Sequence, residues 1–119
     1  MTRNNKIIIS LAKRYENFKK TIQECGSYLL SENDDVIKYN LFEEFSVDVI
    51  SFLHYDTLKL FLDEGMIDND ILKKSIELRN LFIQLEKNTD LFNVRSVKMC
   101  DDWKNLLEKS DEIKKMLYW

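Results

Sequence analysis

The chain has 119 residues, the usual length of one domain, and can bury roughly two-thirds of the surface that its unfolded form would expose. Its composition, 45% hydrophobic and 33% charged, excludes both a disordered chain and an integral membrane protein. No apolar run approaches the ~18 residues that a transmembrane helix needs, and the first ten residues do not have a signal-peptide pattern. Two distant cysteines, Cys25 and Cys100, suit a reducing compartment. We therefore expect a cytoplasmic protein without a membrane partner.

The scarcity of helix-breaking residues predicts an all-α fold. The sequence has no proline and only two glycines, Gly26 and Gly65. It has no internal repeat and no linker that would divide domains. We predict one compact domain over residues 1–119, with about five helices in an orthogonal or bundle-like array.

The first predicted helix covers about residues 4–31 and carries a heptad seam. Free-standing coiled coils usually have longer and more aliphatic seams, which favours packing of this seam inside its own domain. The alternative is a helical adaptor that dimerises through residues 8–29, so we expect a monomer or a weak dimer. The seam residues are Ile8, Leu11, Tyr15, Phe18, Ile22, Cys25 and Leu29.

The second predicted helix forms the centre of the core. Ser31, Asn33 or Asp34 can cap its start, because their side-chain oxygens accept hydrogen bonds from first-turn amides. A broad apolar stripe with a spacing of four residues then predicts burial on more than one side. The stripe consists of Ile37, Leu41, Phe45, Val49 and Leu53.

The third and fourth helices are delimited by turn and capping residues. The third is predicted to begin at Asp56 or Thr57 and to end at Gly65, where glycine can adopt a left-handed conformation. Asp68 is a good N-cap and starts the fourth helix, which ends near Asn88.

The carboxyl-terminal part of the chain contains an aperiodic stretch before a last helix. Residues 88–99 show little periodicity and are predicted to form a loop that covers Leu91, Phe92 and Val94. The last helix is predicted from about Cys100 to Tyr118.

Charge is distributed unevenly along the chain. Residues 1–31 have a balance of +4, residues 32–70 of −9 and residues 71–119 of +2. About four of the eleven carboxylates in the middle segment are explained by helix N-termini, where the dipole favours anions. These four are Asp34, Asp56, Asp68 and Asp70.

The remaining middle carboxylates suggest a binding surface. Glu44 and Asp48 form a like-charge pair at the helical spacing of four residues, and Asp63 and Glu64 stand where a helix dipole opposes them. A surface that keeps repulsive charge is understandable if a cationic partner covers it. Tyr55, Tyr118 and Trp119 are candidate aromatic anchors. The predicted partner-binding residues are Glu43, Glu44, Asp48, Tyr55, Asp56, Asp63 and Glu64.

Motifs for catalysis or for cofactor binding were not found. His54 is the only histidine, and a lone histidine at a helix end is usually a cap or a surface group. One histidine and two distant cysteines cannot close a zinc site, and residues 63–70 lack the ligand pattern of a calcium loop. The two glycines are isolated, so there is no phosphate loop. We expect no enzyme activity, no catalytic residue, no cofactor and no metal.

A nucleic-acid-binding regulator remains a second alternative. The predicted first helix carries a basic patch, but the sequence pI near 5.2 argues against nucleic-acid binding. The patch consists of Lys13, Arg14, Lys19 and Lys20.

The carboxyl-terminal two-thirds of the chain resembles a known family. Across residues 41–117, the segments 65–68, 78–79, 94–97, 102–103 and 111–113 resemble small immunity proteins of bacterial contact-dependent growth inhibition and related polymorphic toxin systems. The resemblance implies a cytoplasmic protein that binds and neutralises a cognate toxin, often a nuclease. A nuclease must attract phosphate and so has a basic cleft, which an acidic helical surface can occupy. The resemblance carries no catalytic residues.

Overall fold

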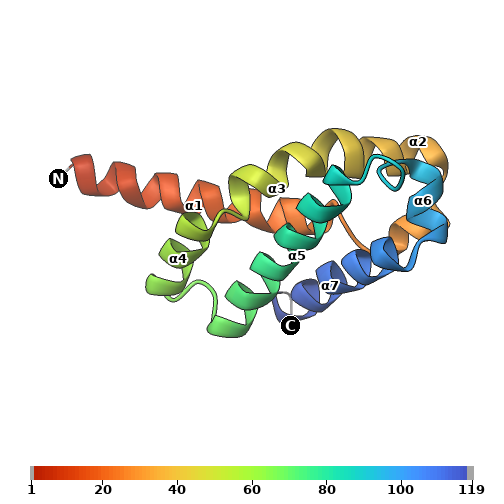
Figure 1. The fold of residues 1–119 in the computed structure, drawn as a ribbon. Coiled ribbons are helices and arrows are strands. Elements are labelled where there is room, and N and C mark those ends of the chain that lie inside the picture. The colour runs from red at the N-terminus through yellow and green to blue at the C-terminus, as the bar shows by residue number, and fades with distance from the viewer. Residues whose placement is uncertain (1, 118–119) are drawn as a thin grey trace.

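The computed structural model describes the backbone of residues 2–117 and the side chains of residues 11–117. All regular structure in this part of the chain is helical, which confirms the predicted all-α class (Figure 1). It contains six helices rather than five, if the continuous rod of α2, η2 and α3 is counted once. The elements are α1 (Thr2–Gln23), η1 (Ser27–Ser31), α2 (Asp34–Ile37), η2 (Lys38–Phe45), α3 (Ser46–Phe52), α4 (Tyr55–Asp63), α5 (Asn69–Lys87), α6 (Val94–Met99) and α7 (Asp101–Leu117).

The first helix is shorter than predicted. Helix α1 ends at Gln23 instead of continuing to residue 31, and the 3-10 turn η1 then carries the fully buried Leu29 into the core. Gly26 permits the break because a Cβ there would lie 2.7 Å from the Asp111 carboxylate of α7. That carboxylate accepts a hydrogen bond from the Ser27 amide at 3.2 Å.

The heptad seam packs inside the chain, as predicted. Phe18, Ile22, Cys25 and Leu29 are fully buried, and Leu11 and Tyr15 are partly buried against the core. The Ile8 side chain lies outside the described residues.

The central rod contains a π-helical segment that the sequence analysis missed. Asn33 caps the rod, since its side chain accepts from the Val36 amide at 3.0 Å. In an α-helix, a strict spacing of four residues rotates by about 40° at each step, so five such residues would not share one face. The wider turns of η2 rotate the chain less per residue and oppose this drift. All five stripe residues, Ile37, Leu41, Phe45, Val49 and Leu53, are consequently buried.

Helices α4 and α5 are joined by a tight turn at Gly65. Its φ of +73° is the left-handed conformation predicted there. The Met66 amide bonds to the Phe61 carbonyl at 2.8 Å and the Gly65 amide to the Leu62 carbonyl at 3.0 Å, which is the Schellman pattern of helix ends. Asp68 caps α5 through the Ile71 amide, as predicted.

Helix α4 begins one or two residues earlier than predicted. It starts at Tyr55 because His54 acts as its cap, with Nδ1 accepting from the Asp56 amide at 3.2 Å. The lone histidine is therefore a capping group on an exposed turn.

The predicted loop at residues 88–99 contains a helix, α6. It has six residues, too few to show periodicity, and Asn93 caps it by accepting from the Ser96 amide at 2.9 Å. The stretch before α6 is held by Trp103, whose indole N–H donates to the Leu91 carbonyl at 2.7 Å. The fully buried Trp103 ring packs in one aromatic cluster with Phe42, Phe45, Phe82 and Phe92.

The described molecule is elongated. Its radius of gyration is 15.0 Å and its principal extents are 52 × 25 × 24 Å, whereas a compact chain of this length has a radius of about 13.5 Å. Helix α1 accounts for the difference, because its amino-terminal half extends beyond the other helices (Figure 1). Within the described residues, the helices all fall short of the length and apolarity that a membrane crossing requires.

Candidate functional site

The structure divides the predicted partner-binding residues into three groups. Glu43, Glu44 and Asp48 lie on η2 and α3, Tyr55 and Asp56 start α4, and Asp63 and Glu64 stand at the other end of α4. The seven steps from Asp56 to Asp63 advance about 10 Å along a helix axis. The predicted residues therefore come from three separate places on the rod and on α4.

One of the predicted carboxylates has a local partner that reduces its free charge. Lys59 donates to Asp63 at 2.9 Å, one helical turn away, which the sequence analysis overlooked. The group on η2 and α3 thus carries the stronger case for binding.

Residues of η2 and α3 combine exposed apolar and acidic side chains. Tyr39, Val47 and Ile50 are exposed to 54%, 63% and 46%. With the exposed Glu43, they follow one another at spacings of three or four residues, so they share one side of the rod. We call these four residues, together with the half-buried Glu44 and Asp48 beside them, the α3 face.

The α3 face is uniformly acidic. Residues 39–52 contain Glu43, Glu44 and Asp48 and no lysine or arginine. The pKa of the Tyr39 phenol is raised, first by a hydrogen bond with Glu44 and then by the charge of that carboxylate. An exposed apolar strip bordered by one sign of charge is the pattern of a recognition surface.

A third carboxylate joins this group from a distant part of the sequence. The Glu24 side chain, directly after α1, lies beside Glu44 and Asp48, and each of the three places a carboxylate oxygen within 4.8 Å of the other two. We call Glu24, Glu44 and Asp48 the carboxylate triad. Sequence reasoning missed Glu24 because twenty residues separate it from Glu44, and only the packing of α1 against α3 brings them together.

Glu24 occupies an environment that disfavours its charge. Only 8% of the residue is exposed, and neither of its carboxylate oxygens accepts a hydrogen bond from another described group. Burial is the main cause that raises its pKa from 4.5 to about 8. The second cause is the hydrogen bond that a protonated Glu24 makes with the Asp48 carboxylate, and the charges of Asp48 and Glu44 follow. Lys20 opposes the shift only weakly from one turn earlier in the chain.

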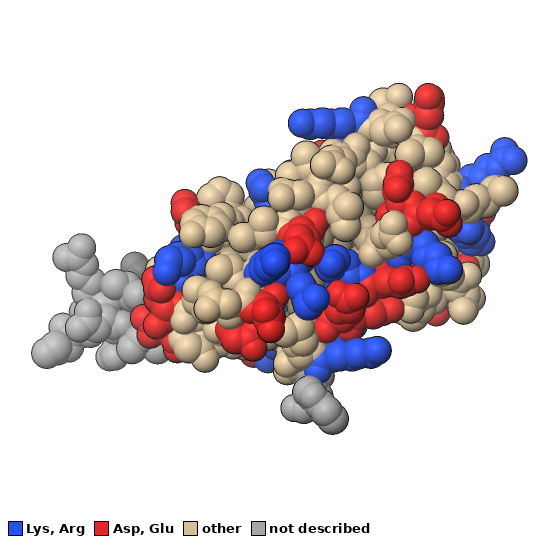
Figure 2. All heavy atoms as spheres, turned by 60° about the horizontal axis from the view of Figure 1, so that its bottom comes forward, with Lys and Arg blue, Asp and Glu red and all other residues tan. Residues whose placement is uncertain are grey.

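Other parts of the surface differ from the α3 face. The side shown in Figure 2 mixes acidic and basic side chains. The ion pairs between α5 and α7 have the same mixed character, with Lys109 2.8 Å from Glu77 and Lys74 3.2 Å from Glu112. The hydrogen bond from Lys109 lowers the pKa of Glu77. Mixed charge that is paired locally offers a partner little net potential.

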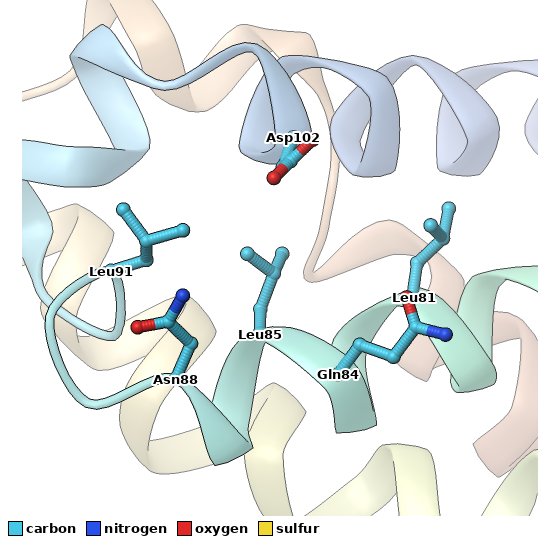
Figure 3. A pocket seen from close by; sticks show the side chains of 6 residues that line it. All are labelled: Leu81, Gln84, Leu85, Asn88, Leu91 and Asp102. Carbon is cyan, nitrogen blue, oxygen red and sulfur yellow. The ribbon is translucent and has the colours of Figure 1, made fainter.

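A hollow of about 240 Å³ lies between the end of α5 and the start of α7. Figure 3 shows Leu81 and Leu85 of α5 and Leu91 of the following loop, with the Asp102 carboxylate of α7 above them. Among its described lining residues, Asp102 is the only titratable group, so the hollow does not hold an acid–base pair. The residues that line it are Leu81, Gln84, Leu85, Asn88, Leu91 and Asp102.

Comparisons with protein-family models, with curated proteins and with solved structures each found no match. We therefore infer the function from the geometry and charge of the chain itself.

Proposed function

We propose that this chain is an immunity-type protein, which binds a basic partner protein through the α3 face and neutralises it. The partner class is a toxin with a phosphate-attracting cleft, such as a nuclease domain. The observation that carries the proposal is the exposed apolar strip of Tyr39, Val47 and Ile50 within an acidic stretch that lacks basic residues. Tyrosine and aliphatic residues at the centre of an interface supply affinity, while surrounding charge steers association.

The dimerising adaptor is less well supported. Its seam residues from Phe18 to Leu29 are fully buried against other helices of the same chain, so they are not available to a second copy. The basic patch of the nucleic-acid alternative is interrupted at Lys19, which pairs with Glu16 at 3.0 Å and lies over the Tyr15 ring.

The proposal is tested with the protein encoded by the reading frame immediately upstream, because immunity genes are expected beside their toxins. Binding kinetics are measured by surface plasmon resonance at several salt concentrations, and activity of the partner is measured on plasmid DNA. We expect binding that inhibits the partner and weakens with increasing salt.

Matched variants locate the surface. Ile50→Asp should raise the dissociation rate about tenfold, since it removes an apolar contact worth roughly 1.4 kcal/mol. Leu60→Asp on α4 is its control, because Leu60 is exposed to 43% and Ile50 to 46%. Glu43→Lys should slow association and reduce its salt dependence, whereas Glu108→Lys, an equal charge reversal at an exposed site on α7, should have a much smaller effect. Equal effects of the test and control variants would exclude the α3 face.

A further inference from the structure

The carboxylate triad poses an electrostatic problem that goes beyond the proposed function. Three carboxylates converge at the junction of α1, η2 and α3, and one of them, Glu24, is more than nine-tenths buried without a hydrogen-bond donor among the described side chains. Burying an unpaired carboxylate costs several kcal/mol. The folded chain can avoid this cost in two ways: Glu24 takes up a proton, as its raised pKa indicates, or a bound cation offsets the charge of the ionised carboxylate.

The position of Glu24 makes its charge still less favourable. Its amide donates to the Lys20 carbonyl at 3.1 Å, so Glu24 stands at the carboxyl-terminal end of α1, directly after its last residue, Gln23. The negative end of the helix dipole lies there and opposes a carboxylate. The nearest compensating charge, on Lys20, belongs to an exposed side chain. Neither the α1 terminus nor Lys20 neutralises the triad.

The spacing of the triad suits a small cation. Ca²⁺ binds oxygen ligands at about 2.3–2.6 Å, so two ligands on opposite sides of the ion are about 4.6–5.2 Å apart. The three carboxylate oxygens all lie within 4.8 Å of one another, inside this limit. The donor set is entirely oxygen, which suits Ca²⁺, Mg²⁺ or Mn²⁺ rather than softer metals.

The triad also leaves access for the ion and for water. Glu44 and Asp48 are only half-buried, so their side of the site faces solvent. Three carboxylates cannot complete the six to eight ligands of Ca²⁺, and water molecules from this side would supply the others. A guanidinium group suits the site less well, because its planar fork of donors matches one carboxylate side by side rather than three that converge on a point.

We propose that Glu24, Glu44 and Asp48 bind a hard divalent cation, with Ca²⁺ the best-sized member of the class. The ion links the end of α1 to η2 and α3, and so supports the rod that carries the α3 face. The triad with its ion retains one net negative charge, so the α3 face stays acidic.

The test is thermal unfolding of the full chain without any partner. After treatment with a chelator, the chain is titrated with CaCl₂, MgCl₂ or MnCl₂ in about 150 mM KCl, which screens diffuse binding to surface charge. A rise in Tm of roughly 5 °C is expected at ten times the dissociation constant of the ion, and above that concentration Tm should increase with the logarithm of the ion concentration. Mn²⁺ should also broaden the amide NMR signals near residues 24, 44 and 48 before others.

Variants distinguish the triad from the general acidity of the surface. Glu24→Gln and Asp48→Asn should each abolish the rise in Tm, whereas Glu43→Gln, at the exposed neighbour of Glu44, should retain it. The absence of a rise in Tm up to about 10 mM of each metal would overturn the proposal, since this concentration exceeds the dissociation constants of weak Ca²⁺ sites. An equal rise in wild type and Glu24→Gln would also overturn it. Because no partner is present, this result is independent of toxin binding.

Discussion

Two fully buried serines provide a matched test of how the end of α1 is stabilised. Ser110 of α7 lies with its hydroxyl oxygen 2.7 Å from the Cys25 carbonyl and 3.0 Å from the Ile22 carbonyl. Ser75 of α5 is equally buried, but its hydroxyl has no hydrogen-bond partner among the residues that the structure describes. The same substitution, serine to alanine, therefore removes a shared hydrogen-bond donor at one site and an unpaired polar group at the other.

The two substitutions should have opposite effects on the free energy of unfolding. Ser110→Ala removes the hydroxyl donor of the Cys25 carbonyl, whereas the Ile22 carbonyl keeps its bond from the Cys25 amide at 3.3 Å. An unsatisfied buried group costs about 1–3 kcal/mol. Ser75→Ala removes only a desolvated hydroxyl and should be neutral or stabilise by up to about 1 kcal/mol. We expect the two variants to differ by about 2 kcal/mol or more, which for a chain of this length corresponds to roughly 8 °C in Tm.

The assay is urea unfolding followed by circular dichroism, with calorimetry for Tm. Both variants keep the helices intact, because alanine is a good helix former in the interiors of α5 and α7. If Ser110→Ala and Ser75→Ala were equally stable, the hydroxyl of Ser110 would not hold the end of α1, and our account of that break would be wrong.

The remaining predictions concern a carboxyl, the two thiols and a glycine. Burial and acidic neighbours raise the pKa of Glu24 to about 8. The folded chain therefore holds a proton that the unfolded chain releases above pH 4.5. As a result, the free energy of unfolding decreases as the pH rises from about 4.5 to about 8. With a chelator present, Glu24→Gln should therefore be more stable than wild type by about 3 kcal/mol at pH 7 and equally stable at pH 4, as measured by urea unfolding. A difference in stability that is constant from pH 4 to pH 7 would contradict the raised pKa of Glu24. Burial raises the pKa of the Cys25 thiol to about 12. Iodoacetamide at pH 8 should therefore alkylate the half-buried Cys100 at least 100-fold faster than Cys25, as measured by mass spectrometry. Faster alkylation of Cys25 would refute its burial. Gly65→Ala should lower the free energy of unfolding by about 1 kcal/mol, as measured with urea, because the φ of +73° strains a residue that has a side chain. A steric clash does not contribute, since no described atom lies within 4 Å of the added Cβ. An unchanged stability would show that the turn does not need glycine.

Local signals in the sequence predicted the helical class and several boundaries correctly. The absence of proline from the sequence indicated the helical class. The left-handed turn at Gly65 and the cap at Asp68 each depend on one residue and its near neighbours, so they can be recognised without a structure. The buried stripe from Ile37 to Leu53 was also predicted. Its strict spacing of four residues already contained a sign of the π-helical turns, since an α-helix cannot keep such a stripe on one face.

Tertiary packing decided the features that periodicity could not show. The first helix stops at Gln23 because side chains of α7 form hydrogen bonds with the backbone groups that follow it. Helix α6 forms although it is too short to give a periodic signal in the sequence. The site depends on packing still more strongly. The sequence alone indicated an acidic middle segment and two members of the triad, Glu44 and Asp48, one turn apart. Glu24 joins them only when α1 packs against α3, because charge and burial depend on neighbours in space, and these neighbours lie far apart along the chain.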